Sequence, residues 1–87
     1  MFTTDDAINA LKNNTYFNAS SICGYCYYSP QKDFNSNVYI EIEAYNDEKN
    51  KFECKLSEAI NKAINLINDC SFISIVKDDD VIFFYNS

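Results

Sequence analysis

The side chains with the most varied chemistry in this sequence are its four cysteines. Cys23 and Cys26 are separated by two residues, in the string Cys23-Gly24-Tyr25-Cys26. A pair of thiols at this spacing can cycle between dithiol and disulfide when a helix N-terminus lowers the pKa of the first thiol. The same pair could hold a structural zinc ion together with Cys54 and Cys70, provided that all four thiols converge. A redox module and a zinc module are therefore both open chemistries.

The residues that follow this string decide how it is interpreted. The string resembles the redox dithiol of glutaredoxin-type proteins, which implies a strand before it and an amphipathic helix after it. Here Tyr27-Tyr28-Ser29-Pro30 follows, and proline is incompatible with a helix interior. We therefore expect the cysteines to be free thiols that pack as small hydrophobic side chains.

Carboxylates are the other candidate reactive groups. Asp78, Asp79 and Asp80 could hold a divalent cation, but they lack the alternating ligands and the glycine of a calcium loop. Glu41 and Glu43 could share acid and base roles, as glycosidase carboxylates do. We expect them instead to pair with Lys51 and Lys55 on the next strand. The sequence predicts no enzyme activity, no metal and no cofactor.

The net charge of the chain limits the kinds of molecule that it can bind. Thirteen acidic residues face seven lysines, giving a net charge of -6, and arginine and histidine are absent. This charge repels phosphate backbones and anionic membranes, so we expect no direct nucleic-acid or membrane binding. The first residues do not resemble a signal peptide, and the longest apolar run, Val81–Tyr85, is too short to span a bilayer. These features favour a cytoplasmic protein with reduced cysteines.

The pattern of apolar residues predicts a single domain over residues 1–87. A helix is expected to begin at a Thr3 cap, with Asp6 three residues on, and to end at Asn13-Asn14. The residues from Ser20 to Tyr28 indicate one strand, in which Gly24 marks a bulge or a close backbone approach. A polar loop over 30–37 follows. Since the chain has one glycine and one proline, its turns must be made by asparagine and aspartate.

The second half of the chain has clearer periodicity. Strict alternation over 38–45 predicts a strand that pairs with 51–55 as a hairpin. Ser57 is expected to cap a second helix that ends at Asn68-Asp69. A further hairpin joins 72–76 to 81–85 through a turn at 77–80. The predicted fold is α+β, with a small antiparallel sheet of about five strands in the order α-β-β-β-α-β-β and two helices packed on one face.

One face of the strand over 38–45 is a candidate partner-binding surface. Alternate residues on a strand share a face, so the carboxylates there form a row flanked by tyrosines. Tyrosines are favoured interface anchors, and carboxylates attract basic partners. Together with the acidic turns, the predicted contact residues are Tyr39, Glu41, Glu43, Tyr45, Asp47, Glu48, Asp78, Asp79 and Asp80.

These features together predict an acidic interaction protein that occupies the basic groove of a nucleic-acid-handling protein. The chain is rich in Asn, Lys, Ile, Tyr and Phe and has no arginine, as an AT-rich coding sequence produces. In this AT-rich composition, and in size, charge and α+β layout, the chain resembles phage-encoded anti-CRISPR proteins, several of which mimic nucleic acid. The resemblance implies a CRISPR effector as target, in a bacterial or archaeal host, and a viral or prophage origin. An antitoxin or immunity protein against a basic toxin is the first alternative. A thiol-redox or zinc module built on Cys23 and Cys26 is the second.

Overall fold

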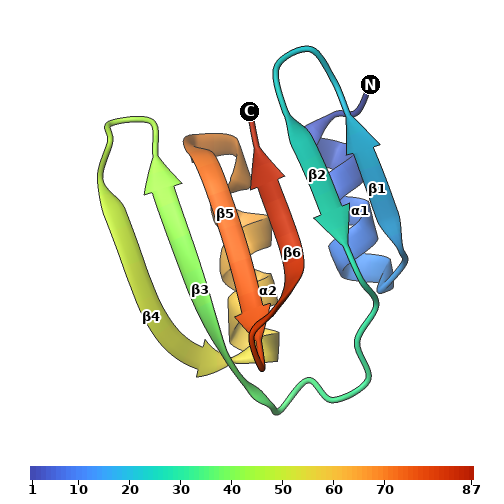
Figure 1. Cartoon of the computed structure of the whole chain (residues 1–87), viewed down its shortest axis with the longest axis vertical. Helices are drawn as coiled ribbons and strands as arrows, with labels where there is room; N and C mark the ends of the chain where they lie inside the picture. The colour runs from blue at the N-terminus through green and yellow to red at the C-terminus, as the bar shows by residue number, and fades with distance from the viewer.

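The computed structural model describes residues 1–87, which form a layer of strands and a layer of helices (Figure 1). In chain order the elements are α1 (Thr4–Asn13), β1 (Phe17–Ser20), β2 (Tyr25–Tyr28), β3 (Asn37–Ala44), β4 (Lys49–Lys55), α2 (Leu56–Leu66), a 3-10 turn η1 (Ile67–Asp69), β5 (Cys70–Lys77) and β6 (Asp80–Asn86). The strands form one sheet in the order β1-β2-β6-β5-β3-β4, and every neighbouring pair is antiparallel. Both helices lie on the same side of the sheet, which confirms the α+β class.

Helix α1 forms where its caps predict. The Thr3 hydroxyl accepts a hydrogen bond from the Asp6 backbone N–H at 3.2 Å, and the Asp6 carboxylate accepts one from the Thr3 N–H at 2.9 Å. This reciprocal pair satisfies two N–H groups that the helix itself leaves without partners. Asn14 ends the helix in the left-handed conformation, with φ 50 and ψ 50. The predicted boundaries are confirmed at both ends.

The prediction of one strand from Ser20 to Tyr28 is wrong. The chain turns back after Ser20, where the Ser21 N–H donates to the Gly24 carbonyl at 2.8 Å, and β1 and β2 pair as a hairpin. The sheet therefore has six strands, and the chain order is α-β-β-β-β-α-β-β. The close approach expected at Gly24 is confirmed, because a Cβ there would collide with the carbonyl oxygen of Asn86 in β6.

Asparagine and aspartate make the other turns, as predicted, but the β1–β2 turn over Ser21 to Gly24 contains neither, so the prediction is wrong there. The residues with positive φ are Asn14, Asp47, Asp78 and Asp79, and no glycine has a positive φ. Asp78 and Asp79 are the two central residues of the β5–β6 hairpin turn, and both are left-handed there. Such a turn matches the twist of a two-residue hairpin, and short polar side chains tolerate it better than others.

The expected role of Ser57 as the cap of α2 is wrong. The helix begins at Leu56, and no side chain caps its first turn. The Leu56 N–H donates to the Ser36 carbonyl at 2.9 Å, and the Ser57 N–H donates to the Phe34 carbonyl at 3.0 Å. Backbone carbonyls of the loop before β3 therefore accept the first N–H groups of α2, which we expected the Ser57 hydroxyl to cap.

The hairpins β3–β4 and β5–β6 are confirmed. Their inward side chains, such as Val38, Ile40, Ile73 and Phe83, are buried against Leu56 and the rest of the helical layer. Neither helix is long and apolar enough to cross a membrane. The opposite face of the sheet has no helix over it (Figure 1), and of the predicted contact residues Tyr39, Glu41 and Glu43 lie on β3, which belongs to this sheet.

Candidate partner-binding surface

The uncovered face of the sheet is organised in rows that run across the strands. One row contains, from β1 to β4, Asn18, Tyr27, Phe84, Ser74, Glu41 and Lys51. The neighbouring row contains Ser20, Tyr25, Asn86, Phe72, Glu43 and Lys49. In each row the aromatic side chains lie on β2, β6 or β5, the carboxylate lies on β3 and the ammonium group lies on β4. The face therefore has an aromatic half and a charged half.

The aromatic half is a stripe of four rings, Tyr25, Tyr27, Phe72 and Phe84, which we call the aromatic stripe. The Phe84 ring centroid lies 5.3 Å from that of Phe72 and 5.8 Å from that of Tyr25. A shallow hollow of about 380 Å³ opens here, lined by two tyrosines of the stripe, Phe84 and Val81. Sequence reasoning missed this stripe. Alternation in β2 was a usable signal, but β5 and β6 are apolar on both faces, so their periodicity does not show which side is open.

The charged half is more balanced than the sequence suggested. Glu41 lies opposite Lys51, as expected, but Glu43 lies opposite Lys49, and the expected pairing with Lys55 is wrong because Lys55 faces Asn37. The Lys51 ammonium also lies 5.7 Å from the centroid of the Tyr39 ring. The carboxylate row of β3 is therefore interleaved with lysines along its outer side.

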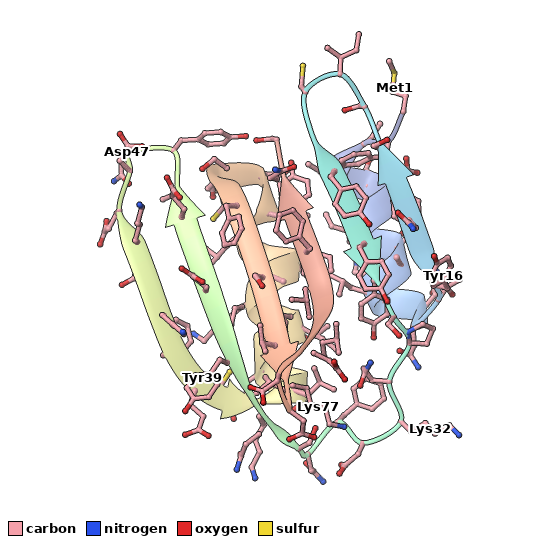
Figure 2. The ribbon with its side chains drawn as sticks, in the orientation of Figure 1. Met1, Tyr16, Lys32, Tyr39, Asp47 and Lys77 are labelled. Carbon is pink, nitrogen blue, oxygen red and sulfur yellow. The ribbon has the colours of Figure 1, made fainter.

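The two acidic turns lie at opposite ends of the sheet. Asp47 and Glu48 form the β3–β4 turn, whereas Asp78 to Asp80 form the β5–β6 turn. Strand β5, which runs from one end to the other, has 8 residues. At about 3.3 Å per residue the turns are about 25 Å apart. Asp47 and Lys77 mark the two ends in Figure 2. The predicted contact residues therefore form separate groups, two at the ends and one along β3.

Negative charge accumulates at the end that holds the β3–β4 turn. The Tyr45 N–H donates to the Asp69 carbonyl at 3.3 Å, which brings η1 beside this turn. The first turn of α1 lies at the same end (Figure 1). We call this region the acidic end; its carboxylates are Asp5, Asp6, Asp47, Glu48 and Asp69, and its lysine is Lys49. At the opposite end lysines offset more of the acidic charge, with Lys12, Lys32, Lys55 and Lys77 beside Asp33, Glu53, Glu58, Asp78, Asp79 and Asp80.

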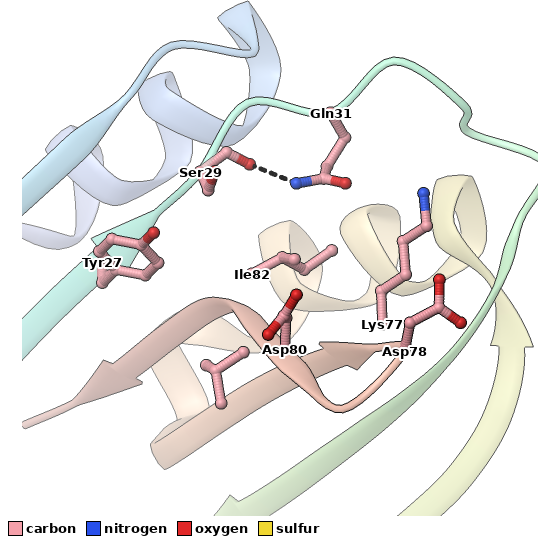
Figure 3. Close-up of a pocket in the computed structure, with 8 residues that line it drawn as sticks. Tyr27, Ser29, Gln31, Lys77, Asp78, Asp80 and Ile82 are labelled. Carbon is pink, nitrogen blue, oxygen red and sulfur yellow. Dashed lines mark hydrogen bonds between the residues drawn. The ribbon is translucent and has the colours of Figure 1, made fainter.

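A cavity of about 400 Å³ opens beside the β5–β6 turn (Figure 3). Lys77 and Asp80 reach its rim from the hairpin, and Gln31 reaches it from the loop that follows β2. The Gln31 side-chain amide donates to the Ser29 carbonyl at 2.9 Å, which fixes that wall. Since the rim carries an ammonium group and carboxylates together, the cavity does not select strongly for one sign of charge.

The cysteines do not form a shared site. Cys23 is exposed on the β1–β2 loop, whereas Cys26 is buried on β2. Burial, with a smaller contribution from Asp6, raises the pKa of the Cys26 thiol to about 12. Strands β2 and β4 are separated by three others, and Cys54 is four residues along β4 from the row of Cys26, so the two cysteines are more than about 19 Å apart at the usual strand spacing. One zinc ion cannot bind both, and a thiol that resists ionisation is a poor redox nucleophile.

The remaining pKa shifts have the same cause and the same direction. Burial raises the pKa of Tyr28, Cys54, Cys70 and Tyr85. A shift upward from an already alkaline value moves each group further from neutral pH. These shifts therefore indicate packing in the core and supply no proton donor or acceptor poised near pH 7.

Comparison with protein-family models, with curated proteins and with solved structures finds no match to this chain. The candidate surface is therefore defined by its own residues. Its parts are the acidic end, the aromatic stripe, and the β3 carboxylates that lie between the stripe and the lysines of β4.

Proposed function

We propose that this protein is an acidic interaction protein that inhibits a nucleic-acid-binding defence effector by occupying its basic groove. The target class is a CRISPR effector of a bacterial or archaeal host, the site of action is the host cytoplasm, and the origin is viral or prophage. In this proposal the predicted contact residues act at different stages of binding. They are Tyr39, Glu41, Glu43, Tyr45, Asp47, Glu48, Asp78, Asp79 and Asp80. The acidic end makes first contact, and the open sheet face follows.

The observation that carries this proposal is the uneven distribution of charge. The acidic end holds five carboxylates and one lysine, whereas the opposite end holds six carboxylates and four lysines. Such an end produces a negative potential that points outward from the molecule. A groove lined with lysine and arginine to bind phosphate produces the complementary positive potential. Because carboxylates on a folded scaffold are not a nuclease substrate, they can fill the groove without being cleaved.

The end itself is held in place by backbone contacts. The Ala44 N–H donates to the Glu48 carbonyl at 2.9 Å, and the Asp47 N–H donates to the Ala44 carbonyl at 3.0 Å. The Tyr45 hydroxyl lies 3.0 Å from the Ser87 hydroxyl, which connects the turn to the last residue of the chain. A fixed array loses less conformational entropy on binding than a flexible acidic tail does.

The test measures target-DNA cleavage by a purified CRISPR effector in the presence of this protein. The variant Asp47→Asn/Glu48→Gln removes two charges at the acidic end while keeping the side-chain shapes. We expect it to slow association by about threefold to tenfold at low salt, with the difference shrinking as salt rises. A matched control, Asp33→Asn/Glu58→Gln, removes two charges at the opposite end. It preserves the acceptor that Asp33 offers to the Asn35 N–H at 3.0 Å.

A third variant, with Asn in place of Asp78, Asp79 and Asp80, tests the other acidic turn. If neither Asp47→Asn/Glu48→Gln nor this variant slows association at low salt, the acidic surface only keeps the protein soluble and the proposal is wrong. If the protein binds no CRISPR effector but captures and neutralises a basic toxin, the same physics serves an antitoxin or immunity protein instead.

A further inference from the structure

The aromatic stripe and the β3 carboxylates are neighbours: Phe72 pairs directly with Glu43, and one small residue separates Phe84 from Glu41. Ser74 pairs with Phe84 on one side and with Glu41 on the other. Two strand spacings separate the ring from the carboxylate, a distance of about 10 Å between their backbones. Ser74 is only 7% exposed, so neighbouring side chains cover it.

The aromatic half of the face lacks positive charge of its own. Strands β1, β2 and β6 contain no lysine, and the chain has no arginine. The charged groups closest to the stripe along the rows are therefore Glu41 and Glu43. Aromatic ring faces and carboxylates both attract cations, so the two groups favour the same kind of occupant.

The same face already holds one cation over an aromatic ring. The Lys51 ammonium lies 5.7 Å from the centroid of the Tyr39 ring, one row away from Glu41. A guanidinium suits the site better than an ammonium, because it is planar, stacks on a ring and donates a fork of hydrogen bonds to a carboxylate.

We propose that the uncovered sheet face binds arginine side chains of a basic protein partner, each stacking on the aromatic stripe and pairing with Glu41 or Glu43 across the sheet. This inference rests on the proposed function, since it names the side chains by which the basic groove is gripped. A single-stranded nucleic acid and a second copy of the chain are the other occupants that an aromatic face accepts. The net charge of -6 opposes both.

The test titrates the full chain by calorimetry with an oligo-arginine peptide and an oligo-lysine peptide of equal length and charge. We expect the arginine peptide to bind about fivefold more tightly, from the stacking that lysine lacks.

Tyr27→Leu and Phe84→Leu keep an apolar side chain but remove the ring, and each abolishes this preference. Phe52→Leu, which removes a ring on the helix side of the sheet beside Lys62 of α2, leaves the preference intact. Glu41→Gln, a surface change that preserves the side-chain shape, lowers the preference without touching the stripe.

Two results distinguish this site from the proposed function. If both peptides bind with equal affinity, the arginine site is wrong and the inhibitor function stands. If the arginine preference is present but the CRISPR effector is not inhibited, the function is wrong and the site stands. Binding of an oligothymidine that Tyr27→Leu abolishes overturns the arginine site. Sedimentation of a dimer that Phe84→Leu dissociates also overturns it.

Discussion

Asn14 joins three segments of the chain, and its removal is the sharpest test of how the fold is held. Its side-chain oxygen accepts hydrogen bonds from the Tyr28 hydroxyl at 2.6 Å and from the Gln31 N–H at 2.9 Å. Its side-chain nitrogen donates to the Gln31 carbonyl at 2.8 Å. Tyr28 is completely buried, so water cannot replace the lost partner. One amide therefore ties the end of α1 to the end of β2 and to the loop that follows.

We expect Asn14→Gly to lower the free energy of unfolding by about 2 to 4 kcal/mol. Three hydrogen bonds at about 0.5 to 1.5 kcal/mol each account for this range. Glycine keeps the left-handed conformation of residue 14, so the change isolates the side chain. Asn14→Ala adds about 1 kcal/mol of backbone strain. For a domain of this size, about 3 kcal/mol corresponds to a fall of roughly 12 to 24 °C in the unfolding midpoint.

The assay is urea unfolding followed by far-UV circular dichroism for Asn14→Gly, Tyr28→Phe and the double variant. Tyr28→Phe removes the hydroxyl that donates to the Asn14 side chain, so both single variants lose this same hydrogen bond. Part of the loss in free energy of unfolding is therefore counted in both. The double variant is then more stable than the sum of the single changes predicts, by about 1 kcal/mol. Strict additivity, or a cost for Asn14→Gly below about 0.5 kcal/mol, would refute the role assigned to this network.

Three further predictions follow from local geometry. Gly24→Ala should destabilise the fold by about 1 to 3 kcal/mol in thermal unfolding, because the new methyl group collides with the Asn86 carbonyl and must push the β1–β2 hairpin away from β6. Asp79→Gly should stabilise by about 0.5 to 1 kcal/mol in urea, since φ is 69 at this position; unchanged or lower stability would count against relief of strain. The pKa of Cys26 rises from 9.0 to about 12 on folding, so the stability gained from its neutral thiol is complete below pH 9 and is lost as pH rises toward 12. The unfolding midpoint should therefore fall more steeply above pH 9 in the native protein than in Cys26→Ala, and parallel curves would contradict this.

Local signals in the sequence were sufficient for much of the fold. The Thr3 and Asp6 pair located the start of α1, and strict alternation located β3, because both patterns depend on residues within one turn or one strand. The start of α2 could not be located in this way. Its first N–H groups bond to carbonyls of Phe34 and Ser36, about twenty residues earlier in the chain, and only the tertiary fold brings them there.

The β1–β2 hairpin was missed for a different reason. Its loop, Ser21 to Gly24, lacks the Asn-Gly or Asp-Gly pair that marks a tight hairpin, and it contains the apolar Ile22. Gly24 was recognised as a position of close approach, yet its partner, Asn86, lies at the far end of the chain. Gly24 is required because a side chain would collide with another strand, and its φ is not positive. The sequence alone does not show which residue such a glycine approaches.

The candidate surface depends on strand order more than on any single strand. The alternation in β3 placed Glu41 and Glu43 on one face, but whether that face is covered depends on where the helices pack. The insertion of β6 and β5 between β2 and β3 brings Phe84 and Ser74 into the same row as Glu41. Non-local pairing therefore creates the juxtaposition on which arginine recognition depends, and it explains why composition alone indicated an acidic partner surface but not its aromatic half.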